Sequence, residues 1–247
     1  KYAFDEYGAM VAEWSLDEDD EKKASDTEAQ EAASTASTSE AWEGNGKYAK
    51  YTQAWKYYNS VEDGSRVSKG WFKVVPAEML NKEKYDDDEE SWYYADGSGN
   101  LYAGEFKTIK GKKYAFRNDG RMLTGLKFIK EGDEDFADVK ADDDDPNFDT
   151  EDDFINHAIS FYLKNIYECY YFGGSEDGAM RTNKTNITID GDNFNFYFEK
   201  SGSNKGAGLT GEKDDKYYLA GMLVKAGSDE KYQVLKKVTL SNGKVAY

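Results

Sequence analysis

One ten-residue phrase occurs twice in the chain, and this repetition constrains the fold more than any other feature. Residues 1–10 read KYAFDEYGAM and residues 113–122 read KYAFRNDGRM, so both contain Lys-Tyr-Ala-Phe, then Gly, then Met at the same spacing. Similar segments, with aromatic residues before a glycine turn, cover residues 55–71, 92–106, 113–128, 170–180 and 196–211. Such repetition is typical of repeat proteins, in which each unit buries its apolar face against its neighbours.

Each unit is predicted to form a β-hairpin. In the second copy of the phrase, Tyr114 and Phe116 alternate with other residues, and Asp119-Gly120 is a strong turn signal. Residues 121–125 would return as the second strand. An isolated hairpin of this size cannot bury its aromatic rings, so we expect the copies to stack. The residues expected in the resulting core are Tyr2, Phe4, Tyr114, Phe116, Phe196 and Phe198.

The composition supports the same fold class. The 247 residues include 20 Tyr, 13 Phe and 5 Trp, with 23 Gly and only 2 Pro. Aromatic side chains suit a pleated surface, and glycine supplies turns with positive φ. We therefore predict an all-β chain, a repetitive β-hairpin solenoid with acidic loop inserts and at most one or two short helices.

Polar and acidic stretches divide the chain into five predicted segments. These are a partial N-terminal repeat (1–14), an acidic and Ala/Ser-rich insert or linker (15–54), a central group of repeats (55–130), an acidic insert (131–167) and C-terminal repeats (168–247). In the second insert, Thr150 and Asp153 are spaced like a capping box. Helical spacing then follows for Ile155, Ala158, Ile159, Tyr162, Leu163 and Ile166. A short helix here competes with a strand that continues into 167–172.

Charge and rare residues exclude several functions. The net charge of −17 disfavours nucleic acid and anionic membrane surfaces, and no transmembrane run or signal peptide is recognisable, so no membrane insertion is expected. The single Cys169 cannot form an internal disulfide, and the single His157 cannot build a histidine cluster. The acidic run 142–145 lacks the spacing of a calcium loop and is interpreted as solvated. No metal site, cofactor or catalytic constellation is predicted, and we expect a chain that is not an enzyme.

At this level of detail the units resemble a known group of repeats. Gly70-Trp71, then Trp92-Tyr93-Tyr94, then Asp96 and Gly99 follow the phrase of the bacterial cell-wall-binding repeats. These repeats are found in choline-binding modules, clostridial toxin tails, streptococcal glucan-binding domains and surface proteins of gut Firmicutes. The resemblance covers most of 1–14, 55–128 and 168–247. It implies a β-solenoid that anchors a secreted protein at the bacterial cell surface.

The resemblance also implies where ligands bind. In its choline-binding members, aromatic rings of consecutive hairpins surround a quaternary ammonium, which the negative ring faces attract. Carried over by position, the candidate ligand-binding residues are Trp55, Tyr57, Trp71, Trp92 and Tyr94. The implied partners are bacterial cell-wall polysaccharide, the choline of teichoic acid, or glucan.

The chain departs from the pattern where later Gly-Trp pairs would stand. Those positions hold Gly104-Glu105-Phe106 and Gly125-Leu126 instead, so few units keep the indole that a choline cage needs. Glucan-binding members stack flat aromatic rings on sugar rings, which fits the many tyrosines. The sequence thus favours generic glycan or cell-wall binding over choline. The alternatives are a structural spacer or protein-interaction array with buried aromatic residues, and, third, a fragment of a wall hydrolase.

Overall fold

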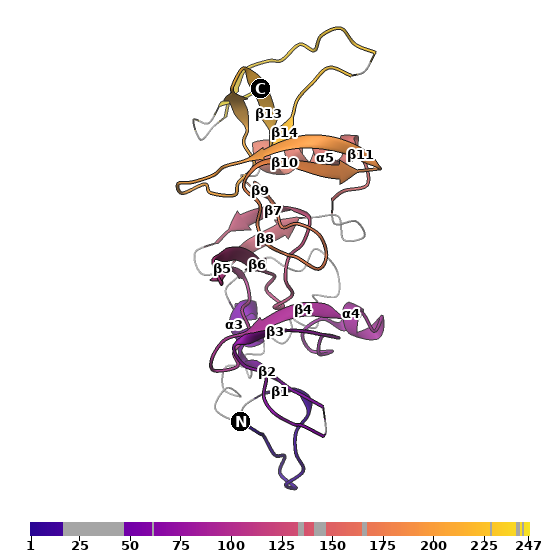
Figure 1. Cartoon of the computed structure of the whole chain (residues 1–247), viewed down its shortest axis with the longest axis vertical. Helices are drawn as coiled ribbons and strands as arrows, with labels where there is room; N and C mark the ends of the chain where they lie inside the picture. The colour runs from indigo at the N-terminus through magenta and orange to yellow at the C-terminus, as the bar shows by residue number, and fades with distance from the viewer. Residues whose placement is uncertain are drawn as a thin grey trace. The chain divides into compact units, whose positions relative to one another are not determined.

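The computed structural model describes residues 1–16, 47–60, 62–132, 136–140, 147–164, 167–227, 229–240, 243 and 245–247. Most of the first predicted insert and the acidic run 142–145 lie outside these described residues. The chain divides into two compact units, traced by colour along the chain in Figure 1. Unit 1 comprises Lys1–Leu123 and Glu131–Asp138, and unit 2 comprises Thr124–Lys130 and Val139–Tyr247.

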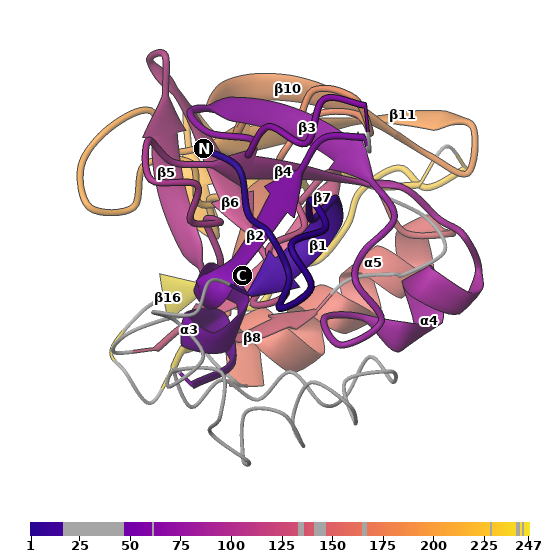
Figure 2. The ribbon, with the colours of Figure 1, turned by 90° about the horizontal axis from the view of Figure 1, so that it is seen from below.

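Unit 1 is built from antiparallel hairpins, each a separate two-stranded sheet. Strand β1 (Glu13–Leu16) pairs with β2 (Trp55–Tyr58), β3 (Gly70–Val74) with β4 (Ser91–Ala95), and β5 (Glu105–Ile109) with β6 (Lys112–Phe116). Helix α3 (Lys47–Ala54) leads directly into β2, and α4 (Lys82–Asp86) lies in the connection from β3 to β4. The two helices lie at opposite ends of the β3–β4 hairpin in both views of the ribbon (Figures 1 and 2).

A turn of the same construction follows β4, follows β6, and occurs in the first copy of the repeated phrase. Single bridges close these turns between Phe4 and Met10, between Ala95 and Leu101, and between Phe116 and Met122. The glycine of each turn has a positive φ, at 80° for Gly8, 83° for Gly99 and 86° for Gly120. Glycine adopts this conformation without steric cost, which is why the repeated phrase retains it.

The pairing of the repeated phrase differs in one respect from the sequence prediction. Residues 121–125 return as expected but contribute only the Phe116–Met122 bridge, and the main partner of β6 is β5. The reason lies in the backbone after the turn, where the N–H of Met122 donates to the carbonyl of Trp92 at 2.8 Å. The returning segment therefore bonds both to its own strand, where the N–H of Leu123 donates to the carbonyl of Ala115 at 2.9 Å, and to the preceding hairpin.

The two copies of the phrase have opposite burial. Tyr114 and Phe116 are buried, as predicted, whereas Tyr2 and Phe4 are 58% and 63% exposed. The prediction that Tyr2 and Phe4 belong to the core is therefore wrong. Trp71 packs on both rings of the second copy, whereas no ring contact to the first copy is found among the described residues. The phrase specifies the turn, and neighbouring hairpins decide its burial.

Unit 2 combines a hairpin pairing with a larger sheet. Strand β7 (Leu126–Glu131) pairs with β9 (Glu168–Tyr171) in a three-stranded sheet of order β8-β7-β9, and the residues of β8 (Phe136–Lys140) are divided between the two units. A five-stranded sheet has the order β10 (Asn183–Ile189), β11 (Asp192–Phe198), β14 (Met222–Leu223), β13 (Lys216–Leu219) and β12 (Gly211–Lys213). Strands β15 (Val238–Thr239) and β16 (Val245–Ala246) form a short pair. Strands dominate both units, so the all-β class is confirmed, although the five-stranded sheet was not expected.

The competing helix in the second insert is present. Helix α5 (Glu151–His157) begins at Thr150, whose hydroxyl accepts from the N–H of Asp153 at 3.1 Å, and a π-helix, η2 (Ala158–Lys164), continues it. Its buried residues are Phe154, Ala158 and Tyr162, at intervals of four. Ile159, expected on the apolar face, is exposed, whereas Ile155 and Leu163 are partly buried against the core, and Ile166 lies outside the described residues. Phe196 and Phe198 pack in the same core as predicted.

The turn glycines give a first test of this construction. Alanine at Gly120 would have to adopt a left-handed backbone conformation, which costs about 1–2 kcal/mol. Its Cβ would also lie 3.3 Å from Tyr93 Cδ1, which is a tight contact. Alanine at Gly8 has the same backbone strain, but no atom lies within 4 Å. In urea unfolding, Gly120→Ala should therefore lower the free energy of unfolding more than Gly8→Ala. Equal losses would contradict the packing of the second turn.

The two copies of the phrase also allow a matched pair of core substitutions. Phe116→Ala removes a fully buried ring and should cost about 3–5 kcal/mol of unfolding free energy. Phe4→Ala removes an exposed ring from the same local turn and should change stability by about 0.5 kcal/mol or less. Thermal and urea unfolding measure both. A large loss for Phe4→Ala would show that the first copy is packed in solution.

Candidate aromatic binding site

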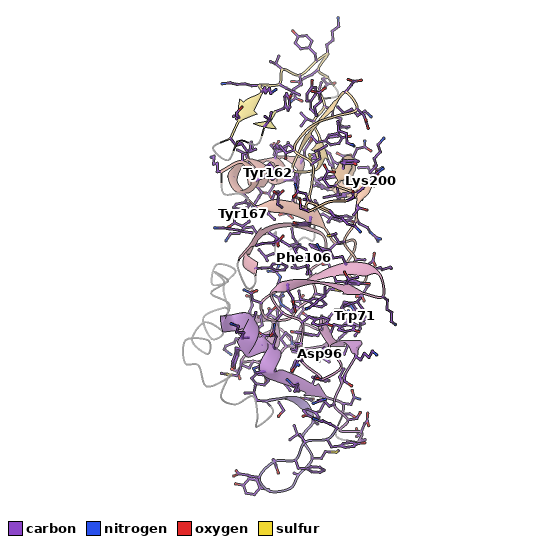
Figure 3. All side chains as sticks on the ribbon, turned by 90° about the vertical axis from the view of Figure 1, so that its left-hand side faces the viewer. Trp71, Asp96, Phe106, Tyr162, Tyr167 and Lys200 are labelled. Carbon is purple, nitrogen blue, oxygen red and sulfur yellow. The ribbon has the colours of Figure 1, made fainter. Side chains whose placement is uncertain are left out.

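Three of the sequence-predicted residues come together on the β3–β4 hairpin. The strand register places Trp71 opposite Tyr94, so their side chains lie on one face. The ring centroids are 5.1 Å apart for Trp71 and Tyr94 and 6.4 Å apart for Trp71 and Trp92, and both pairs meet edge to face. All three side chains are partly buried. We call this group the Trp71 junction, and Trp71 is labelled in Figure 3.

The next hairpin covers one side of the Trp71 junction. Trp71 lies 4.9 Å from the ring of Tyr114 and 5.7 Å from that of Phe116, both in β6. Tyr102, in the segment between the two hairpins, stacks on Tyr94 at 5.2 Å with an interplanar angle of 6°. Trp71 therefore contributes to the packing of two hairpins and still retains part of its surface in solvent.

Lysine side chains lie over two rings at this junction. The Nζ of Lys73 is 5.9 Å from the ring centroid of Trp92, and that of Lys107 is 5.0 Å from Tyr102. Lys107 also forms an ion pair with Glu105 at 2.8 Å. Ring faces attract ammonium groups, so the chain itself supplies cations to this surface. A cationic ligand would be repelled by these ammonium groups, whereas a neutral sugar would not.

The other two predicted residues, Trp55 and Tyr57, lie outside the Trp71 junction. Trp55 meets Tyr51 of α3 edge to face at 6.1 Å. Tyr57 stacks on Phe72 at 5.2 Å and meets Trp14 edge to face at the same distance. They therefore belong to a second aromatic group on the β1–β2 hairpin.

Trp14 is the counterpart of Trp71 in this second group, and the sequence analysis missed it. The register pairs Trp14 with Tyr57 just as it pairs Trp71 with Tyr94. Trp14 also contacts rings of the following hairpin, at 6.0 Å for Phe72 and 5.2 Å for Tyr93. A signal was available, because the interval from Gly8 to Trp14 is close to that from Gly64 to Trp71.

An open cavity of about 580 Å³ lies beside Trp14 and Tyr57. Its lining combines aromatic, apolar and acidic residues: Glu13, Trp14, Tyr57, Val74, Val75, Pro76, Tyr85, Asp86, Asp88 and Glu90. The indole N–H of Trp14 donates to the carbonyl of Val75 at 2.8 Å, which fixes the ring at the wall. Burial raises the pKa of Tyr57, and the charges of Glu13 and Glu90 raise it further. We call this cavity the acidic groove.

In unit 2, the side chains of Cys169 and His157 are packed against other parts of the chain. Cys169 is fully buried, and burial followed by the charge of Glu168 raises the pKa of its thiol, which disfavours the thiolate. His157 lies between the rings of Phe148 and Phe161, with its Nδ1 3.2 Å from Asp153 Oδ1. Within the described part of the chain, no group of three His, Cys, Asp or Glu residues could hold a metal ion. No described helix has the length and apolar character needed to cross a membrane.

Among known proteins, only solved structures match this chain. No protein-family model matches the chain, and no curated protein does. Solved structures do, among them choline-binding protein F from Streptococcus pneumoniae, at 16% identity over 91% of this chain, with a TM-score of 0.29. The Cpl-1 endolysin in complex with a peptidoglycan analogue matches at 17% identity over 78% of this chain, with a TM-score of 0.35.

At these low identities, the chain is similar to solved structures of choline-binding proteins. A further match is the choline-binding protein CbpJ from Streptococcus pneumoniae, at 15% identity over 98% of this chain, with a TM-score of 0.29. The chain spans 54% of choline-binding protein F, 34% of the endolysin and 60% of CbpJ.

Proposed function

We propose that this chain is a non-catalytic repeat module that binds bacterial cell-wall polysaccharide and anchors a secreted protein at the cell surface. The observation that carries the proposal is the Trp71 junction. There, Trp71, Trp92 and Tyr94 converge on one face of a hairpin, and each ring retains exposed surface. Rings wholly committed to a core would leave no surface for a ligand, whereas amphipathic rings at a junction can contribute to both packing and binding.

Glycan is the preferred ligand, and choline is the second. Lys73 and Lys107 already lie over rings of this surface, and a quaternary ammonium would have to displace them. The net charge of −17 also opposes the phosphates of teichoic acid. A neutral sugar ring is repelled neither by the lysine ammonium groups nor by the carboxylates of the chain, and it would stack on a ring face that Lys73 and Tyr102 leave free. Choline stays the alternative because the junction has the aromatic content of a cation cage.

The same proposal includes a solenoid of stacked hairpins. In unit 1, the N–H of Met122 bonds to the carbonyl of Trp92, and that of Arg66 bonds to the carbonyl of Lys1 at 2.9 Å. In unit 2, the N–H of Gly208 bonds to the carbonyl of Cys169 at 2.7 Å. Each bond links the segment after a turn to an earlier part of its own unit. Such recurrent links support a repeating step of one hairpin on the next.

A structural spacer is the second candidate function, and a specific contact favours it. Trp71 is stacked on Phe116 at an interplanar angle of 27°, so a large part of this ring serves packing. In this view the aromatic residues hold the array together and the acidic surface meets a protein partner.

Retention on purified wall fractions separates the two functions. The unaltered chain should be retained on peptidoglycan, on choline-containing teichoic acid or on α-glucan. Trp92→Ala and Tyr94→Ala should each weaken this retention by roughly 2- to 30-fold, the range that corresponds to 0.5–2 kcal/mol for one ring. Free choline should compete only if the alternative ligand is correct.

The matched control is Tyr7→Ala, which removes a ring that is 87% exposed and lies outside the Trp71 junction. It should leave retention unchanged, and circular dichroism should show that all three variants are folded. If the unaltered chain binds no fraction, or if Tyr7→Ala is as damaging as Trp92→Ala, the spacer function is preferred.

A further inference from the structure

The acidic groove carries a charge that unit 1 does not neutralise. Of its four carboxylates, Asp86 forms an ion pair with Lys82 at 2.9 Å. Among the residues that the structure describes, Glu13, Asp88 and Glu90 form no ion pair. All four groove carboxylates are exposed, so their negative charge favours the approach of a cation.

The walls of the acidic groove suit an organic cation better than a bare metal ion. Trp14 and Tyr57 are partly buried and fixed by their ring contacts, and Tyr85 of α4 is 47% exposed. Ring faces attract cations, and Val74 and Pro76 provide apolar surface for an aliphatic chain. The volume of about 580 Å³ lies in the usual range for ligand pockets and exceeds what a single amine would fill.

We propose that the acidic groove binds the cationic side chain of a lysine or arginine in a basic peptide segment. The ammonium or guanidinium would donate hydrogen bonds to the carboxylates of Glu13, Asp88 and Glu90, and its aliphatic stem would lie along Trp14 and the apolar wall. Three unpaired carboxylates present acceptors, so a ligand with N–H donors gains charge-assisted hydrogen bonds here. A fully methylated ammonium has no such donors and would gain only the ring contacts.

This site is separate from the Trp71 junction. The groove is lined by β1, β2, the end of β3 and the α4 segment, and none of Trp71, Trp92 or Tyr94 lines it. The inference therefore does not rest on the proposed wall binding. One molecule could bind glycan through the junction and a basic peptide through the groove.

The test uses an acetylated and amidated Gly-Lys-Lys-Gly peptide, measured by calorimetry at low ionic strength and by the indole N–H resonance of Trp14. We expect saturable binding with a shift of this resonance. The same peptide with trimethylated lysines should bind several-fold more weakly, and the peptide with acetylated lysines should not bind. Equal affinity for the trimethylated peptide would overturn the proposal.

Paired substitutions in the α4 segment separate the groove from the general negative charge of the chain. Asp88→Asn with Glu90→Gln removes two groove carboxylates, and asparagine tolerates the positive φ of 55° at position 88. Affinity for the lysine peptide should fall about fivefold. Asp87→Asn with Glu83→Gln changes the net charge equally on exposed residues that do not line the groove, and should leave affinity within about twofold.

Equal loss in the two double variants would mean non-specific attraction and would overturn the proposal, as would absence of saturable binding. The variant Trp92→Ala distinguishes peptide binding from wall binding. It should reduce retention on wall fractions and leave the affinity for the peptide unchanged. Failure of wall binding with intact peptide binding, or the reverse, would therefore identify which of the two proposals is wrong.

Discussion

A two-stranded hairpin is too thin to bury its own aromatic rings, and the structure of unit 1 depends on this constraint. Trp14 on the first hairpin packs on Phe72 and Tyr93 of the second. Trp71 on the second packs on Tyr114 and Phe116 of the third. Each tryptophan thus buries rings of the neighbouring hairpin, which further strands would bury in a wider sheet. Packing on the next hairpin therefore stabilises each hairpin.

The same arrangement leaves surface for binding. A tryptophan between two hairpins has one side in the core and another at the edge, where cross-strand tyrosines such as Tyr57 and Tyr94 extend the aromatic surface. The equivalent position on the third hairpin holds Phe106, which meets Phe136 at 4.9 Å and lies under Lys113. Phe106 is thus partly buried as well, and other parts of the chain contact its ring.

The sequence predicts local geometry well because turns depend on a few neighbouring residues. The turn glycines, the burial of Phe196 and Phe198, and the capped start of α5 at Thr150 could all be predicted. Strand pairing was harder. The β10–β11 hairpin turns at Asp190-Gly191, a strong signal that was available in the sequence and was overlooked.

Burial and cavities depend on distant residues, and here prediction failed or was impossible. Identical KYAF segments differ in exposure because only the second meets Trp71. The acidic groove brings Glu13 and Trp14 beside Asp88 and Glu90, residues far apart in the sequence. No local pattern joins these segments, so the groove could not be predicted from the sequence, although the interval from Gly8 to Trp14 did indicate Trp14 itself.

The contact between Trp71 and Tyr114 is the most direct test of this account. A double-mutant cycle with Trp71→Leu and Tyr114→Leu, read by urea unfolding, measures the coupling free energy of the two rings. If the tryptophan of one hairpin stabilises the next, the coupling should be about 0.5–1.5 kcal/mol. A coupling indistinguishable from zero, with the two single losses simply adding, would contradict the claim that aromatic contacts hold consecutive hairpins together.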